Sequence, residues 1–244
     1  AIGVAFGAER LGFYRKAMLV YDNLLDLTIS LHGVAAVSLS KLRTNPTELR
    51  RLWAKGLTTI SFFAMPAFGL LAVTSRDLID LVLGERWDFA GFLLSLLALR
   101  GIPHVVERTM GWLHVATGRS DLWMRWGLVQ AGVQLVALLI GLQFGLMGII
   151  AAYTLTMYVM FVPTLVYAGR PLGIGGLDVV RAVWQPMGGT LVAVAVGFLL
   201  DLLVWPDIQR FPRMVLVGLS FVVVYVVLVA GVMRLTEPLL LVRK

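Results

Sequence analysis

The chain has 244 residues, of which 59% are hydrophobic and 14% are charged, and its mean hydropathy is +0.87. Soluble domains carry about 25% charged residues, so this composition excludes an ordinary soluble domain and predicts an integral membrane protein. The net charge of +7 would suit nucleic acid only on a basic soluble module, and the sequence contains no such module, so no nucleic-acid partner is expected. Without cysteine, disulfides and thiolate metal sites are excluded.

The first residues are typical of a membrane helix that is already under way. The segment AIGVAFG at residues 1–7 is apolar, and no charged region precedes a short apolar core with a cleavage site, so no signal peptide is indicated. We expect a C-terminal fragment that forms one transmembrane domain over residues 1–244. Residues 1–12 would be the end of a preceding helix and a loop, residues 13–235 the spans, and residues 236–244 a tail.

Seven apolar segments are long enough to cross a bilayer, which takes about 20 helical residues. They are residues 13–39, 57–74, 89–116, 122–142, 146–168, 183–204 and 214–233. The third is the longest and implies tilt or an extension beyond the bilayer. The predicted fold class is therefore an all-α polytopic bundle of about seven membrane-spanning helices.

Basic residues are distributed unevenly between the two ends of these spans. Alternate loops hold twelve lysines and arginines on one side and seven on the other. The richer side includes the segment KLRTNPTELRRLWAK at residues 41–55 and the C-terminus. The positive-inside rule predicts that both are cytoplasmic. Within the segment, Asn45, Pro46 and Glu48 have the spacing of a helix start, which predicts an interfacial helix.

Four prolines lie in or at the ends of predicted spans: Pro66, Pro103, Pro163 and Pro186. Proline has no N–H, so it frees the carbonyl one turn earlier and kinks the helix. Mobile transporter helices use such kinks, but static bundles contain them too. The prolines alone therefore do not distinguish a transporter from a scaffold.

The third span carries a stripe of polar side chains, namely Arg100, His104, Glu107, Arg108 and His114. At about 100° per residue, all five fall within a sector of about 120° on one continuous helix. Each ionised group in mid-membrane costs about 2.5–3.5 kcal/mol on insertion scales. We therefore expect the stripe to face protein or a wet cavity.

Three interpretations of the stripe remain open. Glu107 would neutralise Arg108 and Arg100 in a purely structural network. His104 and Glu107, at i and i+3 with His114 further along, would bind a metal, but the carboxylate density of such sites is missing and no metal is predicted. In the third interpretation, Arg100, His104 and Arg108 line a cationic cavity for an anionic substrate. Guanidinium groups suit a diphosphate because they stay charged and bind it bidentately.

The first span holds a second polar set, in which Arg15, Asp22 and Asp26 fall within about 20° of one line. Snorkelling to the interface is the ordinary explanation for Arg15. Asp22 and Asp26 lie deeper and repel each other, so one of them would take up a proton readily and would suit coupling to an ion gradient. The alternative is that each aspartate pairs with a basic residue on a neighbouring or missing helix.

Enzymatic motifs are lacking. The sequence contains no Gly-x-Ser-x-Gly elbow, no phosphate-binding glycine loop, no His-Glu-x-x-His, and no nucleophile with an adjacent base. We therefore predict a protein that is not an enzyme and needs no cofactor.

Several short segments follow one another in a characteristic order along the whole chain. They are GAERLGFY at residues 7–14, VSLSKL at 37–42, TELRR at 47–51, FGL at 68–70, LGERW at 83–87, LLALRG at 96–101 and ATGRSDL at 116–122. In this order they resemble the C-terminal half of bacterial polysaccharide and O-antigen flippases, the Wzx-type branch of the superfamily of multidrug, oligosaccharidyl-lipid and polysaccharide exporters. A proline that is frequent in this family near Val37 is absent here.

The resemblance implies that the seven spans are helices eight to fourteen of a two-lobe, fourteen-helix transporter that works by rocking alternating access. The chain would be the C-lobe, and the N-terminal lobe would be missing. In related exporters the eighth and tenth helices help line the cavity. Here these are the spans that carry Arg15, Asp22 and Asp26, and the residues from Arg100 to Arg108.

The implied function is a flippase for an undecaprenyl-diphosphate-linked oligosaccharide in the bacterial inner membrane. Arg15, Arg100, His104 and Arg108 would bind the substrate, and Asp22, Asp26 or Glu107 would carry coupling ions. The expected partners are the lipid-linked oligosaccharide, membrane lipids, the N-terminal lobe, and a polysaccharide polymerase with its assembly machinery. The alternatives are a multidrug or cation antiporter on the same fold, or a non-transporting component of glycan assembly.

Overall fold

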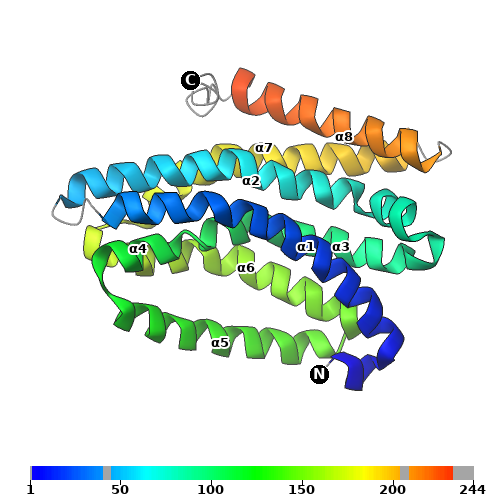
Figure 1. The fold of residues 1–244 in the computed structure, drawn as a ribbon, viewed down its shortest axis with the longest axis horizontal. Helices are drawn as coiled ribbons and strands as arrows, with labels where there is room; N and C mark the ends of the chain where they lie inside the picture. Colours follow the sequence, from blue (N-terminus) through cyan, green and yellow to red (C-terminus); the bar gives the residue numbers. More distant parts are fainter. Residues whose placement is uncertain (1, 41–44, 204–208, 233–244) are drawn as a thin grey trace.

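The computed structural model describes residues 2–40, 45–203 and 209–232, which form helices and no strands (Figure 1). The α-helices are α1 (Ile2–Ser40), α2 (Pro46–Leu83), α3 (Asp88–Glu107), α4 (Met110–Thr117), α5 (Ser120–Leu142), α6 (Gly145–Gly169), α7 (Gly176–Leu203) and α8 (Arg210–Val226). Short 3-10 turns occur at η1 (Glu85–Trp87) and η2 (Arg170–Leu172), and a π-helical turn, η3 (Val227–Val232), follows α8. The predicted all-α class is confirmed.

The long helices lie roughly side by side along the long axis of the molecule, with α8 at one edge and α5 at the other (Figure 1). The central helix is α2, which contacts α3, α7 and α8. Its large apolar side chains Trp53, Met65 and Phe68 are fully buried. The core thus runs along α2, and α5 presents mostly exposed apolar residues, as a lipid-facing helix would.

Six helical segments of the described chain are long and apolar enough to cross a membrane. They are Pro46–Leu83, Glu85–Thr117, Ser120–Leu142, Gly145–Leu172, Gly176–Leu203 and Arg210–Val229. They correspond to the second through seventh predicted spans. The first predicted span lies in α1, whose first 27 residues include six charged side chains.

The backbone of α1 breaks at Gly7, which has φ of 86°. A left-handed φ costs glycine little because it has no Cβ. The helix resumes immediately after Gly7, so residues 8–12 are helical instead of forming the expected loop. The break separates the short apolar segment at the N-terminus from the helix that carries Arg15.

The start of α2 agrees with its sequence signals, although the helix is longer than expected. The Asn45 side chain accepts a hydrogen bond from the Glu48 backbone N–H at 3.2 Å, and Pro46 occupies the first turn, which confirms the predicted cap. The interfacial helix, however, is not a separate element. It continues through the second span to Leu83 as one 38-residue helix. Lys41 and Arg43, two basic residues at the start of the same segment, lie outside the described residues.

The third predicted span is two helices. α3 ends at Glu107, Arg108 and Thr109 form a turn, and α4 begins at Met110. The Thr109 hydroxyl donates to the Val106 carbonyl at 2.7 Å and helps to hold this turn. The single-helix geometry used for the stripe therefore ends at Glu107, and the angle predicted for His114 does not apply.

Three of the four prolines share a structural feature. In each case the carbonyl four residues earlier, which proline leaves without its helical donor, accepts a hydrogen bond from a hydroxyl on another helix. The pairs are Tyr225 to Phe62 at 2.7 Å for Pro66, Tyr158 to Leu99 at 3.0 Å for Pro103, and Thr58 to Ala182 at 2.9 Å for Pro186. These bonds join α2 to α8, α3 to α6, and α7 to α2. The proline sites are thus fixed to neighbouring helices in this conformation.

Candidate functional site

Three charged residues of α1, which we term the α1 charged face, point away from the bundle. Arg15, Asp22 and Asp26 are exposed. The opposite side of α1 is buried through Ala17, Tyr21 and Leu25. No helix of the described chain covers the α1 charged face. Because lipid cannot solvate three charges on one helix face, this surface requires water or another protein surface beside it.

His104 joins α1 to α3. The Tyr21 hydroxyl lies 2.6 Å from His104 Nδ1, and the two rings are nearly parallel, at an interplanar angle of 9°. Tyr21 itself is 1% exposed. The predicted substrate-binding histidine therefore bonds to the buried side of α1, and its ring positions that helix against α3.

Arg100 points from α3 towards α6. Its guanidinium carbon lies 5.9 Å from the centroid of the Tyr153 ring, a cation–π contact. The buried Nε atom has no hydrogen-bond partner among the residues that the structure describes. Arg100 thus points towards α6, inside the lobe.

Glu107 is buried, with 8% of its surface exposed, and binds to α5 and α6. Its Oε1 accepts a hydrogen bond from the Gln130 side-chain amide and lies 3.5 Å from the Thr164 hydroxyl. Trp126 Nε1 donates to the same hydroxyl at 2.9 Å. A cavity of about 10 Å³ beside this network is lined by Arg100, Glu107, Gln130, Gln134, Tyr153, Thr156, Met157 and Met160. That volume suits one water-sized occupant.

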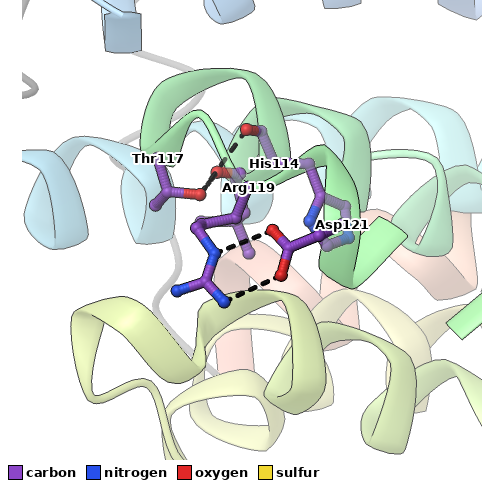
Figure 2. Close-up of polar contacts among 5 residues, drawn as sticks. His114, Thr117, Arg119 and Asp121 are labelled. Carbon is purple, nitrogen blue, oxygen red and sulfur yellow. Dashed lines mark hydrogen bonds and ion pairs between the residues drawn. The ribbon is translucent and has the colours of Figure 1, made fainter. Parts of the chain in front are cut away.

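The other two members of the stripe separate. Arg108 is exposed at the turn after α3. His114 is 2% exposed on α4, and its ring stacks on Trp123 with centroids 5.6 Å apart. Just beyond it, Arg119 and Asp121 form an exposed bidentate pair at the start of α5 (Figure 2). The stripe therefore points in three directions: to α1, to α5 and α6, and outward.

This arrangement concerns two interpretations of the stripe, namely the network of ion pairs and the metal site. No ion pair joins Glu107 to Arg100 or Arg108 within the described chain. The structural network that exists uses amide and hydroxyl donors instead. Within the described residues, no group of three or more histidine, aspartate or glutamate side chains could hold a metal ion. The structure brings Arg100 and Glu107 to one small cavity and leaves Arg15, Asp22, Asp26 and Arg108 exposed.

The sequence reasoning missed a charged cluster at the opposite edge of the bundle, which we term the α8 ion cluster. Arg213 makes two hydrogen bonds to the buried Asp77, one of them from Nε at 3.2 Å, and lies 3.4 Å from Asp201. Arg210 pairs with Asp80 at 2.6 Å. Two acids three residues apart on α2 face two arginines three residues apart on α8. This matched spacing is the signal in the sequence that could have predicted the cluster.

Comparison with known proteins gives three related matches. A family model described as "Polysaccharide biosynthesis protein" matches residues 1–90. The lipopolysaccharide biosynthesis protein WzxC of Escherichia coli K12 is 24% identical over 165 residues, which are 67% of this chain and 34% of WzxC. The teichuronic acid biosynthesis protein TuaB of Bacillus subtilis 168 is 29% identical over 126 residues, or 51% of this chain and 26% of TuaB.

Two further matches extend the comparison. A membrane protein from the cps region of Klebsiella pneumoniae is 32% identical over 93 residues, or 38% of this chain and 19% of that protein. The lipid II flippase MurJ, in an inward closed conformation, has the same fold, with a TM-score of 0.70 at 15% identity over 91% of this chain and 47% of MurJ. The chain thus spans about a third or less of the curated relatives and about half of MurJ. Together the matches confirm that the chain is similar to the polysaccharide flippase family.

Proposed function

We propose that this chain is the C-terminal lobe of a flippase that moves a lipid-linked oligosaccharide, of the undecaprenyl-diphosphate type, across the bacterial inner membrane by alternating access. The similarity to WzxC, to TuaB and to the fold of MurJ supports this class of protein. The proposed topology places the segment at residues 41–55 and the C-terminus in the cytoplasm, because most basic residues lie on that side.

The observation that carries the proposal is the exposure of the α1 charged face. Arg15, Asp22 and Asp26 occupy one side of a helix that packs into a membrane bundle by its other side. A second lobe facing α1 across a wet cavity would remove these charges from lipid. An alternating-access transporter needs such a cavity, whereas a compact scaffold would gain nothing from three uncovered charges.

Within that cavity we assign the exposed Arg15 and Arg108 to the diphosphate. Both present forked guanidinium donors that match phosphate oxygens. Arg100, which lies over Tyr153, would reach the substrate from the side of the lobe, with His104 beside it. The sugar would follow the polar cavity while the lipid tail stays in the bilayer.

Ion coupling is assigned to the carboxylates. Asp22 and Asp26 are one turn apart on the α1 charged face, where cavity water would reach them. Glu107 is enclosed by Gln130 and Thr164, so it would exchange protons only when α3, α5 and α6 separate. We also include a polysaccharide polymerase with its assembly machinery among the proposed partners, since the exported unit must be extended.

The test is glycan export by the full-length protein carrying Arg100→Ala with Arg108→Ala. Export of the glycan to the cell surface should be abolished while protein abundance in the membrane stays normal. The matched control is Arg125→Ala, which removes an exposed arginine from α5 and should leave export unchanged. Normal export by the double variant would remove these arginines from the mechanism, and intact glycan export together with lost drug efflux would favour the antiporter.

A further inference from the structure

A second cavity lies at the end of the bundle where α2 and α7 begin. Its volume is about 900 Å³. It is lined by residues of these two helices only, namely Thr47, Arg50, Arg51, Trp53, Ala54, Lys55, Thr58, Thr59, Asp178, Arg181 and Ala182. None of them belongs to the α1 charged face or to the stripe. The cavity is therefore separate from the proposed transport pathway.

The lining is strongly basic, with four cationic side chains and one carboxylate. Arg50 and Asp178 form a pair at 2.6 Å, and Asp178 also accepts a hydrogen bond from the Gly175 N–H at 2.8 Å. These contacts join α2 to the start of α7 and neutralise Arg50. Arg51 and Arg181 are exposed, and within the described residues Arg51 makes a loose contact with Glu48, at 3.6 Å. The positive charge available to a ligand is thus concentrated at the mouth of the cavity.

Two further features favour an anionic, amphipathic ligand. The cavity lies at the N-terminal ends of two long helices, whose dipoles add positive potential. Beside Arg181, Leu177, Val180 and Trp184 form an exposed apolar stripe along α7, with exposures of 70%, 43% and 49%. An ionic mouth that continues into an apolar helix face matches a phosphate headgroup with attached acyl chains.

We propose that this cavity is a binding site for the headgroup of an anionic glycerophospholipid. Arg51 and Arg181 hold the phosphodiester, and the acyl chains follow the apolar stripe of α7. The Arg50–Asp178 pair keeps the two helix ends at the separation that the headgroup needs. The site holds a resident membrane lipid and does not depend on the proposed export of glycan.

The experiment uses native mass spectrometry of the protein released from micelles that contain phosphatidylcholine and increasing phosphatidylglycerol. Arg51→Gln with Arg181→Gln should lower the retention of phosphatidylglycerol about ten-fold. Arg50 is left intact because its loss would leave Asp178 unpaired. The matched control is Arg125→Gln with Arg170→Gln, which removes two exposed arginines from the same predicted side of the membrane, outside the cavity. This control should retain phosphatidylglycerol as the unchanged protein does.

Three results would overturn the proposal. Unchanged retention in the cavity variant excludes the two arginines as ligands. An equal loss in both double variants shows a general attraction of basic residues to anionic lipid. Displacement of phosphatidylglycerol by millimolar inorganic phosphate, with no dependence on the acyl chains, identifies a site for a free anion instead. Thermal unfolding of each variant, measured alongside, should match that of the unchanged protein if the substitutions act on binding alone.

Discussion

The α8 ion cluster and the α1 charged face both place charged side chains on membrane helices, but the lobe pairs the charges of only the first. In the α8 ion cluster, Arg213 and Arg210 meet carboxylates within the lobe, and the side chain of Asp77 is only 5% exposed. On the α1 charged face, Arg15, Asp22 and Asp26 lie on the open side of their helix. Both sets occupy helices of a predominantly apolar bundle. They differ in whether another helix of the same lobe provides the opposite charge, as α2 does for α8.

This difference separates structural charge from charge that is held for another purpose. A buried ion pair recovers through Coulomb attraction and hydrogen bonds most of the free energy lost on desolvation. An uncovered charge on a membrane helix recovers none of it until water, a substrate or a second lobe arrives. Removing charge should therefore destabilise the protein at the α8 ion cluster and alter function at the α1 charged face.

The largest expected effect follows from Asp77→Asn. The substitution keeps the shape of the side chain but removes the carboxylate that Arg213 binds most closely, while Asp201 stays 3.4 Å away. Breaking a buried pair by removing one partner costs about 3–5 kcal/mol. Because Arg213 is partly exposed, we expect a loss of about 3 kcal/mol here. Unfolding in mixed micelles of mild detergent and dodecyl sulfate measures that loss of the free energy of unfolding.

Asp121→Asn is the matched control. Its pair with Arg119 is also bidentate, with distances of 2.8 and 2.9 Å, but it lies exposed at the start of α5 (Figure 2). Water replaces the lost contact there, so the free energy of unfolding should not change measurably. Equal effects of the two substitutions would contradict the view that burial, rather than pairing geometry, makes the α8 ion cluster structural.

The pattern of helices could be predicted from the sequence because local signals determine it. Apolar length marked six spans that the structure confirms, and Asn45, Pro46 and Glu48 marked the start of α2. The turn at Arg108 and Thr109 was not predicted, since an apolar helical pattern continues across it. The length of α2 was also underestimated, because charged residues at a membrane interface do not interrupt a helix.

The directions of individual polar side chains could not be predicted, because they depend on partners distant in sequence. His104 binds Tyr21, which is 83 residues away, and Tyr158 binds the Leu99 carbonyl across 59 residues. A helical wheel gives the angle of a side chain on its own helix and does not identify the neighbouring helix. The α8 ion cluster required the same missing information, namely that α2 and α8 lie side by side.

Intermediate losses of stability are expected at the carbonyls that the prolines leave without a helical donor. They test whether hydroxyl donors from neighbouring helices stabilise the bundle. Tyr225→Phe and Tyr158→Phe each remove a donor to a carbonyl freed by proline. Interhelical hydrogen bonds in membranes contribute about 0.6–1.7 kcal/mol, and the same unfolding assay should detect a loss of this size. Tyr167→Phe is the control, because that ring stacks on Trp126 and keeps this contact without its hydroxyl. A loss equal to that of the control would show that the freed carbonyls need no partner.

A small effect on stability should come from Asp22→Asn with Asp26→Asn, the substitutions that test the α1 charged face directly. No ion pair within the described chain holds either carboxylate, and both are exposed, so the free energy of unfolding should change by less than about 0.5 kcal/mol. Under the proposed ion coupling, glycan export by the full-length protein should nevertheless fall strongly, because asparagine carries no charge to bind and release a coupling ion. A stability loss as large as that of Asp77→Asn would instead show that these carboxylates bind a partner structurally, and normal export would exclude both from ion coupling. The comparison is clearest when the free energy of unfolding and glycan export are measured on one preparation. A fall in export without a fall in stability is expected only where the charge serves function.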